Sequence, residues 1–253
     1  LVGAYRAADK RVAVLAVDPS SPFTGGALLG DRVRMQDHAT DPAVFIRSMA
    51  TRGHLGGLAA AAPQAIRVLD AAGYDLIIVE TVGVGQSEVE VADLADSTVV
   101  LLAPGMGDAI QAAKAGILEI GDIYCVNKAD REGADVTARE LRGMLAMGRD
   151  SKQSPSDGAS AAPWRPPIVK TVASRGEGIE DLMNALTSHA DYLEQSGDLL
   201  ERRLRRASAE IEALAVAALR GNLKTNQSSQ LARLAREVVS GTTDPHHAAQ
   251  SLF

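Results

Sequence analysis

The 253-residue sequence has very little of what several common protein classes require. Cys125 is its only cysteine, so the chain can form no internal disulfide, and no nearby cysteine or histidine completes a structural zinc site. No apolar run reaches the ~20 residues that a membrane-spanning helix needs. These features exclude a disulfide-stapled domain and a structural zinc module, and they predict no transmembrane segment.

The chain also lacks an excess of basic residues. It has 26 Lys and Arg against 32 Asp and Glu, and the formal net charge of -6 gives no broad basic field that would attract nucleic acid. Residues 1–6 lack the pattern of a secretory signal. Apolar residues at 46% and charged residues at 23% are typical of a globular protein. We therefore expect a cytoplasmic protein that binds neither nucleic acid nor membrane.

Short apolar segments that resemble strands alternate with helical stretches such as 57–72. The predicted strands are 12–17, 44–47, 76–79, 98–102, 123–126 and 168–172, and Cys125 is expected to be a buried strand residue. Near-continuous apolar strands between helices indicate an α/β fold with a mostly parallel sheet and helices on both faces. Ligands of such sheets bind beyond the carboxyl ends of the strands, so the loops that follow the strands are the places to look for chemistry.

The end of the sequence predicts a separate helical arm. We place a first domain at 1–193, closed by a helix at 179–193, and the arm at 194–253. Apolar or small residues in the arm recur at an alternating spacing of four and three, as in the seam of a helix that packs on another helix, at Leu200, Leu204, Ala207, Ile211, Leu214 and Ala218. The charged residues around the seam, Arg202, Arg203 and Arg206 among them, are a solvated face or the rim of a dimer interface, and we favour the interface.

Two other features carry structural expectations only. The segment 149–167, rich in Pro, Ser and Gly around Trp164, is predicted to be an irregular excursion outside the core. His246 and His247 are adjacent and point in different directions on a helix, which disfavours metal chelation by this pair and predicts a solvated surface.

The most specific chemical motif is Asn-Lys-Ala-Asp at 127–130, directly after the strand 123–126. The carboxylate of Asp130 can accept the N1 hydrogen and the 2-amino group of guanine together, a charge-assisted contact that adenine cannot supply. Lys128 can lay its alkyl stem on the purine face, and the amide of Asn127 can tie this loop to its neighbours. The alternative is a polar turn between a strand and a helix, but the position after an apolar strand favours a base-reading loop.

A second motif lies at 75–83, where a buried strand ends in Glu80 and a glycine follows at Gly83. Glu80 can hold Mg²⁺ directly or through water, and the backbone N–H of Gly83 can approach a terminal phosphate closely. A surface-facing acidic strand end would explain Glu80 but not the glycines. Because no Lys-Ser or Lys-Thr follows them, we interpret 84–88 as a switch segment in which Gln86 is a weak candidate for orienting water.

The third motif, Val-Asp-Pro-Ser-Ser at 17–21, again follows a strand and leads to Gly-Asp at 30–31. Asp18 and Asp31 could contact Mg²⁺ and move when the terminal phosphate is lost. Alone, Asp-Pro-Ser-Ser is a common turn.

In this order, the motifs resemble those of the MeaB/ArgK family of GTPases, relatives of the signal-recognition and nickel-insertion GTPases. The resemblance covers about 11–193 and is carried by the segments at 17–21, 25–31, 80–88 and 127–130. It implies a P-loop NTPase-like fold, GTP or GDP with Mg²⁺ as ligands, and a C-terminal arm that makes a homodimer. It also implies a GTP-hydrolysing chaperone that gates adenosylcobalamin loading and protects methylmalonyl-CoA mutase or a similar acyl-CoA mutase.

The resemblance also assigns roles to particular residues. The positions of the Mg²⁺-site acids match Asp18, Asp31 and Glu80, and those of the base-reading residues match Asn127, Lys128 and Asp130. The segment 104–114 resembles an additional switch that communicates with the mutase, with Asp108, Gln111 and Lys114 as its working residues. A helix start capped by Asp108 is the structural alternative.

The chain departs from the family pattern in two places. At 172–174, Val-Ala-Ser replaces the usual Ser-Ala, which leaves Ala173, beside Ser174, as the backbone donor to guanine O6. The sequence also has no Gly-x-x-x-x-Gly-Lys-Ser/Thr, and residues 1–9 read as the end of a helix. We therefore expect the phosphate-binding loop to lie upstream of residue 1, and the chain without that loop to be inactive.

Two other functions stay open from the sequence. An ATPase or kinase linked to basic amino-acid transport is disfavoured by Asp130, which would face the acceptor N1 of adenine. A non-hydrolysing scaffold that works through its helical arm would fit a true loss of the phosphate loop. A nickel-insertion role is less favoured, because clustered Cys and His ligands are missing.

Overall fold

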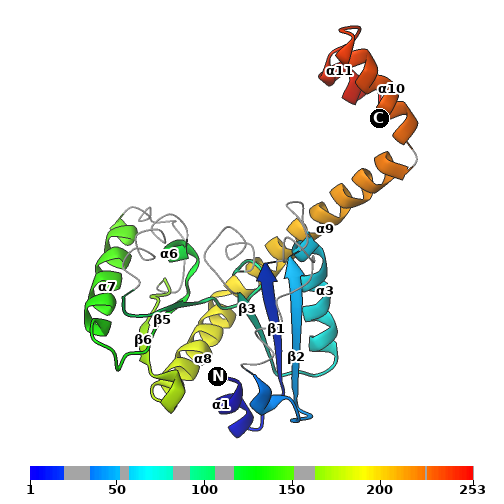
Figure 1. The fold of residues 1–253 in the computed structure, drawn as a ribbon. Coiled ribbons are helices and arrows are strands. Elements are labelled where there is room, and N and C mark those ends of the chain that lie inside the picture. The colour runs from blue at the N-terminus through cyan, green and yellow to red at the C-terminus, as the bar shows by residue number, and fades with distance from the viewer. Residues whose placement is uncertain are drawn as a thin grey trace. The chain divides into compact units, whose positions relative to one another are not determined.

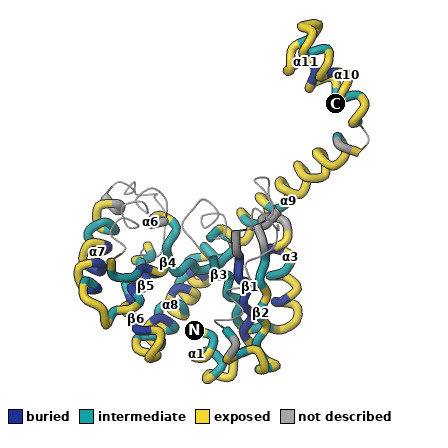
Figure 2. The backbone as a smooth tube through the Cα atoms, in the orientation of Figure 1, coloured by how far each residue is buried: buried dark blue, intermediate teal, exposed yellow. Residues whose placement is uncertain are grey.

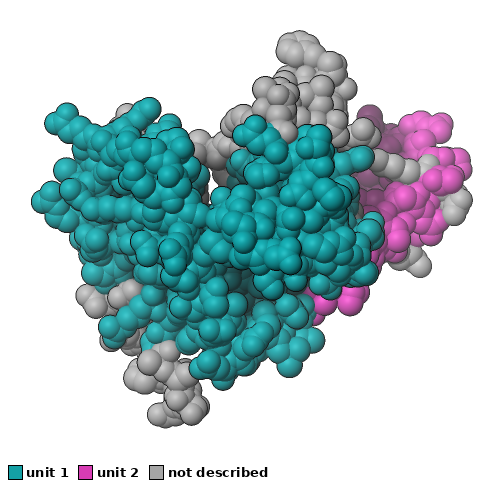
Figure 3. All heavy atoms as spheres, turned by 90° about the horizontal axis from the view of Figure 1, so that it is seen from below, with its two compact units in different colours: residues 1–206 teal, residues 207–253 magenta. Residues whose placement is uncertain are grey.

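The computed structural model describes residues 1–19, 35–51, 57–81, 92–105, 117–150, 163–225 and 227–252. The chain divides into two compact units, Leu1–Arg206 and Ala207–Phe253, which are coloured separately in Figure 3. The division falls inside the long helix α9 (Asp198–Thr225). The functional division at 193 into a GTPase domain and an arm stays a prediction.

Every strand pair in the two sheets of the described residues is parallel. The strands are β1 (Val12–Pro19), β2 (Val44–Thr51), β3 (Leu76–Thr81), β4 (Val99–Leu102), β5 (Ile123–Asn127) and β6 (Ile168–Thr171). They form one sheet in the order β2-β1-β3 and another in the order β4-β5-β6 (Figure 1). The predicted α/β fold with a parallel sheet is confirmed.

The helices follow the order expected from the sequence. The described helical segments of the first unit are α1 (Val2–Ala7), η1 (Gln36–His38), α3 (Gly57–Ala71), α6 (Ile117–Ile120), α7 (Ala134–Asp150), η2 (Ala173–Arg175), α8 (Ile179–Ser196) and the beginning of α9. The second unit contains the rest of α9, α10 (Ser228–Val239) and α11 (Pro245–Gln250). No helix of the described segments is both long enough and apolar enough to cross a lipid bilayer.

β5 is buried on both of its faces, which explains its unbroken apolar sequence. Successive strand residues point to opposite faces. Tyr124 and Val126 pack with Leu141 of α7, whereas Ile123 and Cys125 pack with α8 through Leu182. Helices therefore cover both faces of this sheet, and Cys125 is a buried strand residue as predicted. In the other sheet, the residues of β1 from Val12 to Val17 are buried, and this strand is dark blue in Figure 2.

Four strands, β1, β2, β3 and β5, continue beyond their predicted ends. β2 and β3 reach Thr51 and Thr81, because parallel pairing with β1 satisfies the backbone of polar residues such as Ser48 and Glu80 as well as that of apolar ones. An apolar pattern marks the buried part of a strand, but the hydrogen-bond ladder extends further. This extension carries β3 one residue past Glu80, the residue at which the sequence predicted the strand to end.

A buried polar network lies at the start of β5, around Asp122. The Asp122 carboxylate accepts hydrogen bonds from the backbone N–H of Thr98 at 2.9 Å and from the two terminal nitrogens of Arg202 at 3.0 and 2.8 Å. The Nε2 atom of His189 lies 3.4 Å from the same carboxylate, and Nδ1 lies 2.7 Å from Ser97 Oγ. This network joins the first turns of α9 to the sheet and to α8.

The network bears on two expectations from the sequence. Residues 163–167, the described end of the predicted irregular segment, are irregular as expected, but Trp164 is half-buried: its indole N–H donates to the Asp122 carbonyl at 2.8 Å, and its ring centroid lies 4.8 Å from that of His189. The composition of the segment indicated its irregular backbone but not this contact of its Trp side chain. Arg202 belongs to this network and not to a solvated face, while Arg203 and Arg206 bind Asp96. His246 and His247 are exposed as predicted.

The environment of Asp122 stabilises its ionised form. Burial by itself would raise the pKa of this carboxyl, but the nearby imidazole of His189 and the hydrogen bonds from Arg202 and the Thr98 backbone outweigh burial and lower the pKa from its ordinary value. Because the folded-state pKa is depressed, the stabilisation is present above the unfolded pKa of about 3.9 and is lost as the pH falls through the folded value.

We predict that Asp122→Asn lowers the free energy of unfolding by about 2 kcal/mol at pH 7, because it leaves Arg202 without its charged partner. The difference from the parent protein should shrink as the pH falls below about 4. Urea denaturation across this pH range checks both points. Asp191→Asn, on the exposed surface of α8, is the matched control. Equal stability of Asp122→Asn and the parent at pH 7 would contradict the role given to the network.

Candidate functional site

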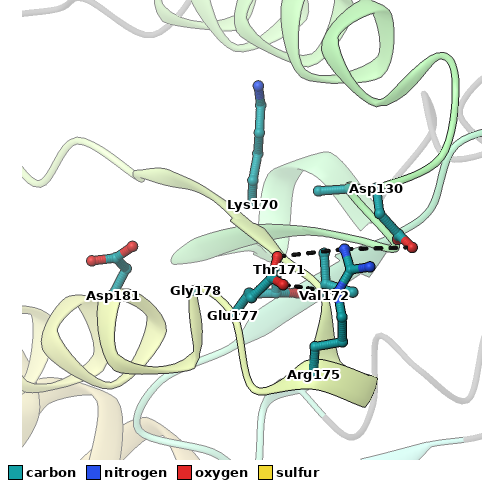
Figure 4. Close-up of a pocket in the computed structure, with 9 residues that line it drawn as sticks. Asp130, Lys170, Thr171, Val172, Arg175, Glu177, Gly178 and Asp181 are labelled. Carbon is teal, nitrogen blue, oxygen red and sulfur yellow. Dashed lines mark hydrogen bonds and ion pairs between the residues drawn. The ribbon is translucent and has the colours of Figure 1, made fainter.

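The candidate site lies where β5 and β6 end. Asn127 and Thr171 are the last residues of these parallel strands and pair in register. The loops that follow therefore leave the same edge of the sheet, where ligands of parallel sheets bind. A cavity of about 290 Å³ opens there, lined by Ala129, Asp130, Lys170, Thr171, Val172, Arg175, Glu177, Gly178 and Asp181 (Figure 4).

Hydrogen bonds from the end of β6 fix the amide of Asn127. Its Oδ1 accepts from the hydroxyl of Thr171 at 3.1 Å and from the backbone N–H of Ala173 at 3.1 Å. The N–H of Ala129 donates in turn to the carbonyl of Thr171 at 3.0 Å. The Sγ of Cys125 lies 3.2 Å from the buried Thr171 hydroxyl. Together these bonds join the Asn-Lys-Ala-Asp loop to the loop after β6.

The N–H of Ala173 thus has an acceptor within the protein. The sequence assigned this N–H to guanine O6, so a base oxygen would have to share it with Asn127 or replace the amide. Ser174 follows it in the exposed turn η2. The sequence pointed to the Ala173 N–H as a donor, but it gave no sign of this acceptor within the protein.

Lys128 has a backbone conformation that is rare for residues other than glycine. Its φ is 56°, in the left-handed region, and its carbonyl accepts from the N–H of Arg131 at 3.0 Å in the turn that follows β5. Such a conformation costs about 1 kcal/mol, and it persists where the surrounding structure imposes it, often at binding sites. The turn places the next acidic residue, Asp130, at the cavity.

Asp130 faces the closing loop across the cavity. Its Oδ2 lies 3.7 Å from Nη2 of Arg175, and Nε of Arg175 lies 2.8 Å from Oε1 of Glu177 (Figure 4). The side chain of Asp130 is 40% exposed, so its carboxylate is accessible from the cavity. The site therefore presents an anionic acceptor with a cation beside it.

Two glycines shape the closing loop. Gly176 and Gly178 have φ values of 74° and 73°, and the N–H of Val172 donates to the carbonyl of Glu177 at 3.0 Å, which closes the loop between them. A Cβ at position 178 would overlap the carbonyl oxygen of Lys170, whereas one at 176 would meet open space. Sequence reasoning did not identify these residues or Arg175, although Gly-Glu-Gly directly before the helix α8 was a usable sign.

The first sheet carries the predicted metal-site acids that the structure describes. Glu80 is the penultimate residue of β3 and pairs in register with Ala16 of the neighbouring β1. Asp18 is the penultimate residue of β1, further toward the same strand ends. Among the residues that are described, no group of three or more His, Cys, Asp or Glu could hold a metal ion. The Mg²⁺ assignment of these acids thus stays a prediction.

The other predicted site residues lie outside the described ranges. They are Asp31, Gly83, Gln86, Asp108, Gln111 and Lys114. The structure therefore describes the residues predicted to read the base, Asn127, Lys128, Asp130, Ala173 and Ser174, and their role also stays a prediction. The phosphate, water and switch assignments stay predictions from the sequence.

Comparison with known proteins points to one family. The sequence profile described as "Methylmalonyl Co-A mutase-associated GTPase MeaB" matches residues 1–228. A protein of Pyrococcus abyssi that carries a GTPase name is 49% identical over 96% of this chain and 73% of its own. A mouse protein named "Methylmalonic aciduria type A homolog, mitochondrial" is 36% identical over 96% of this chain and 58% of its own.

A solved structure shows the same fold. The crystal structure of an LAO/AO transport system kinase aligns with 99% of this chain and 73% of its own, with a TM-score of 0.62 and 24% sequence identity. At this identity the likeness concerns the fold and carries no information about substrate.

We predict that Gly178→Ala destabilises the protein by about 3 kcal/mol, because the methyl group adds steric overlap to the cost of a left-handed backbone. Gly176→Ala is the matched control, because it has the same backbone conformation without the overlap, and should cost about 1 kcal/mol. Thermal denaturation of both variants separates the two effects. Equal losses in the two variants would show that the close approach to Lys170 contributes nothing.

Proposed function

Because the chain belongs to the family of methylmalonyl-CoA mutase-associated GTPases (MeaB), we propose that it binds and hydrolyses GTP as a chaperone of such a mutase. In this proposal it gates the loading of adenosylcobalamin and protects methylmalonyl-CoA mutase or a similar acyl-CoA mutase. The observation that carries the nucleotide part is the carboxylate of Asp130, which faces a cavity beyond the carboxyl ends of β5 and β6.

The donor pattern of the base explains why this carboxylate would select guanine. Guanine offers two adjacent donors, the N1 hydrogen and the 2-amino group, and a carboxylate accepts both in a charge-assisted pair. Adenine offers an acceptor at N1, which would meet the oxygens of Asp130 without a proton between them. Lys128 would cover the face of the purine, and Asn127, anchored by Thr171, would hold the two loops in register around it.

The metal part of the proposal rests on the first sheet. β1 and β3 are adjacent and parallel, so Asp18 and Glu80 belong to the same edge of the sheet. These acids and Asp31 are hard oxygen ligands of the kind that Mg²⁺ takes. Mg²⁺ bound there would neutralise charge that develops on the phosphates. Gly83 would approach the terminal phosphate, and Gln86 would orient water.

The partner part of the proposal draws on the relatives and on α9. The names of the family and of the mouse relative point to a mutase partner. Asp108, Gln111 and Lys114 would form the switch that reports the nucleotide state to it. Exposed apolar residues recur along α9, with Leu200, Leu204 and Ile211 more than half exposed, which supports packing against a second copy as a homodimer. We place the protein in the cytoplasm, without nucleic acid or membrane as partners.

We predict that Asp130→Asn weakens GDP binding by roughly 10- to 100-fold and favours xanthosine diphosphate, whose 2-oxo group accepts from the new amide. Calorimetric titration with GDP, XDP and ADP, on protein expressed from its complete reading frame, measures this change. Asp191→Asn keeps the same charge change away from the cavity and should retain the preference for GDP. Equal affinity of the parent protein for ADP and GDP would refute guanine selection by this site.

The partner is tested by copurification. Tagged protein loaded with GDP or with a non-hydrolysable GTP analogue should recover an acyl-CoA mutase subunit from cell extract, in amounts that differ between the two nucleotides. Immunodetection of the mutase measures the recovery, and protein without nucleotide is the control. Absence of the mutase in both loaded states would count against the chaperone role and leave the GTPase assignment intact.

A further inference from the structure

We propose that Arg175 is a specificity-determining residue that competes with the base for Asp130. Its guanidinium lies beside the carboxylate that would bind guanine. This inference rests on the proposed function, because it concerns how the same cavity admits its nucleotide. It assigns to Arg175, which lies outside the Asn-Lys-Ala-Asp motif, an effect on the affinity and selectivity of nucleotide binding.

The geometry places one nitrogen between two acids. Nη2 of Arg175 lies 3.7 Å from Oδ2 of Asp130 and 3.5 Å from Oε2 of Glu177, while Nε lies 2.8 Å from the other oxygen of Glu177. Figure 4 shows the guanidinium directed toward Asp130 across the cavity. All three side chains are at least 40% exposed, so this arrangement can open without breaking the core.

The backbone holds Arg175 in this place. The N–H of Arg175 donates to the carbonyl of Val172 at 2.9 Å, and the bond from Val172 to Glu177 closes the loop on its other side. Gly176, in the left-handed conformation, turns the chain between the two charged residues. The loop therefore fixes the backbone of Arg175 beside the cavity, within reach of Asp130.

The chemistry of the guanidinium explains the competition. It presents adjacent N–H donors in a plane, as the N1 and 2-amino edge of guanine does, and both patterns fit the same carboxylate. A base that supplies this donor pair can displace Arg175 and compensate Asp130. A base without it must displace the cation and leave the carboxylate uncompensated, which is discrimination against the wrong ligand.

Glu177 sets how strongly Arg175 competes. It holds the guanidinium through its own carboxylate and so offers Arg175 a partner when the base arrives. When the negative charge at Glu177 is removed, Asp130 is the one of these two acids that can still pair with Arg175. The two residues should therefore have opposite effects on nucleotide affinity.

The test measures GDP binding to the complete protein with Mg²⁺ by calorimetry. Arg175→Gln should bind GDP about two- to fivefold more tightly, because an exposed ion pair of ordinary strength no longer occupies the site. Glu177→Gln should bind GDP about twofold more weakly, and the double variant should match Arg175→Gln. Arg220→Gln, an exposed arginine of α9, controls for the change in net charge.

The outcomes separate this inference from the proposed function. Unchanged or weaker GDP binding by Arg175→Gln, with the parent still preferring GDP over ADP, overturns the competition and leaves the function standing. Weaker binding would instead show that Arg175 contacts the base favourably. A parent protein that binds neither nucleotide overturns both.

Discussion

The pairing of Asn127 with Thr171, at the ends of two parallel strands, is the constraint on which the candidate site depends. It brings two loops that are distant in sequence to one edge of the sheet. The side chains of the same two residues are also hydrogen-bonded, because the hydroxyl of Thr171 donates to the amide oxygen of Asn127. The position of Asp130 follows from this join, because only a short turn separates it from Asn127.

The strand β5 is anchored by polar groups at both ends. At its start, the carboxylate of Asp122 accepts hydrogen bonds from the backbone of Thr98, just before β4, and from Arg202 of α9. At its end, Asn127 accepts from Thr171 of β6 and from Ala173 in the closing loop. Between them, apolar side chains pack against helices on both faces. A buried strand that is hydrogen-bonded at both ends is a firm support for the loops that carry the candidate site residues.

The acidic residues at the two ends of β5, Asp122 and Asp130, differ in their exposure to solvent, and therefore in the role that each can have. Asp122 is buried, with its side chain 9% exposed, and its bonds to Arg202 contribute to folding. Asp130 is 40% exposed and its ion pair with Arg175 is weak, as expected for a pair in water. A weak, exposed pair can be exchanged for a ligand at lower cost than a buried one. The same pair of residue types thus stabilises the fold at one end of β5, and at the other end it has the exposure that the proposed exchange with the base requires.

The sequence by itself determined the α/β class, the order of the elements, the burial of Cys125 and the motif that ends in Asp130, because each of these follows from local periodicity and residue chemistry. The tertiary structure alone decided which groups meet. The bonds of Thr171 and Ala173 to Asn127, the approach of Arg175 to Asp130, and the packing of Trp164 on His189 join residues far apart in the chain. Such contacts depend on strand pairing and register, which no local pattern encodes.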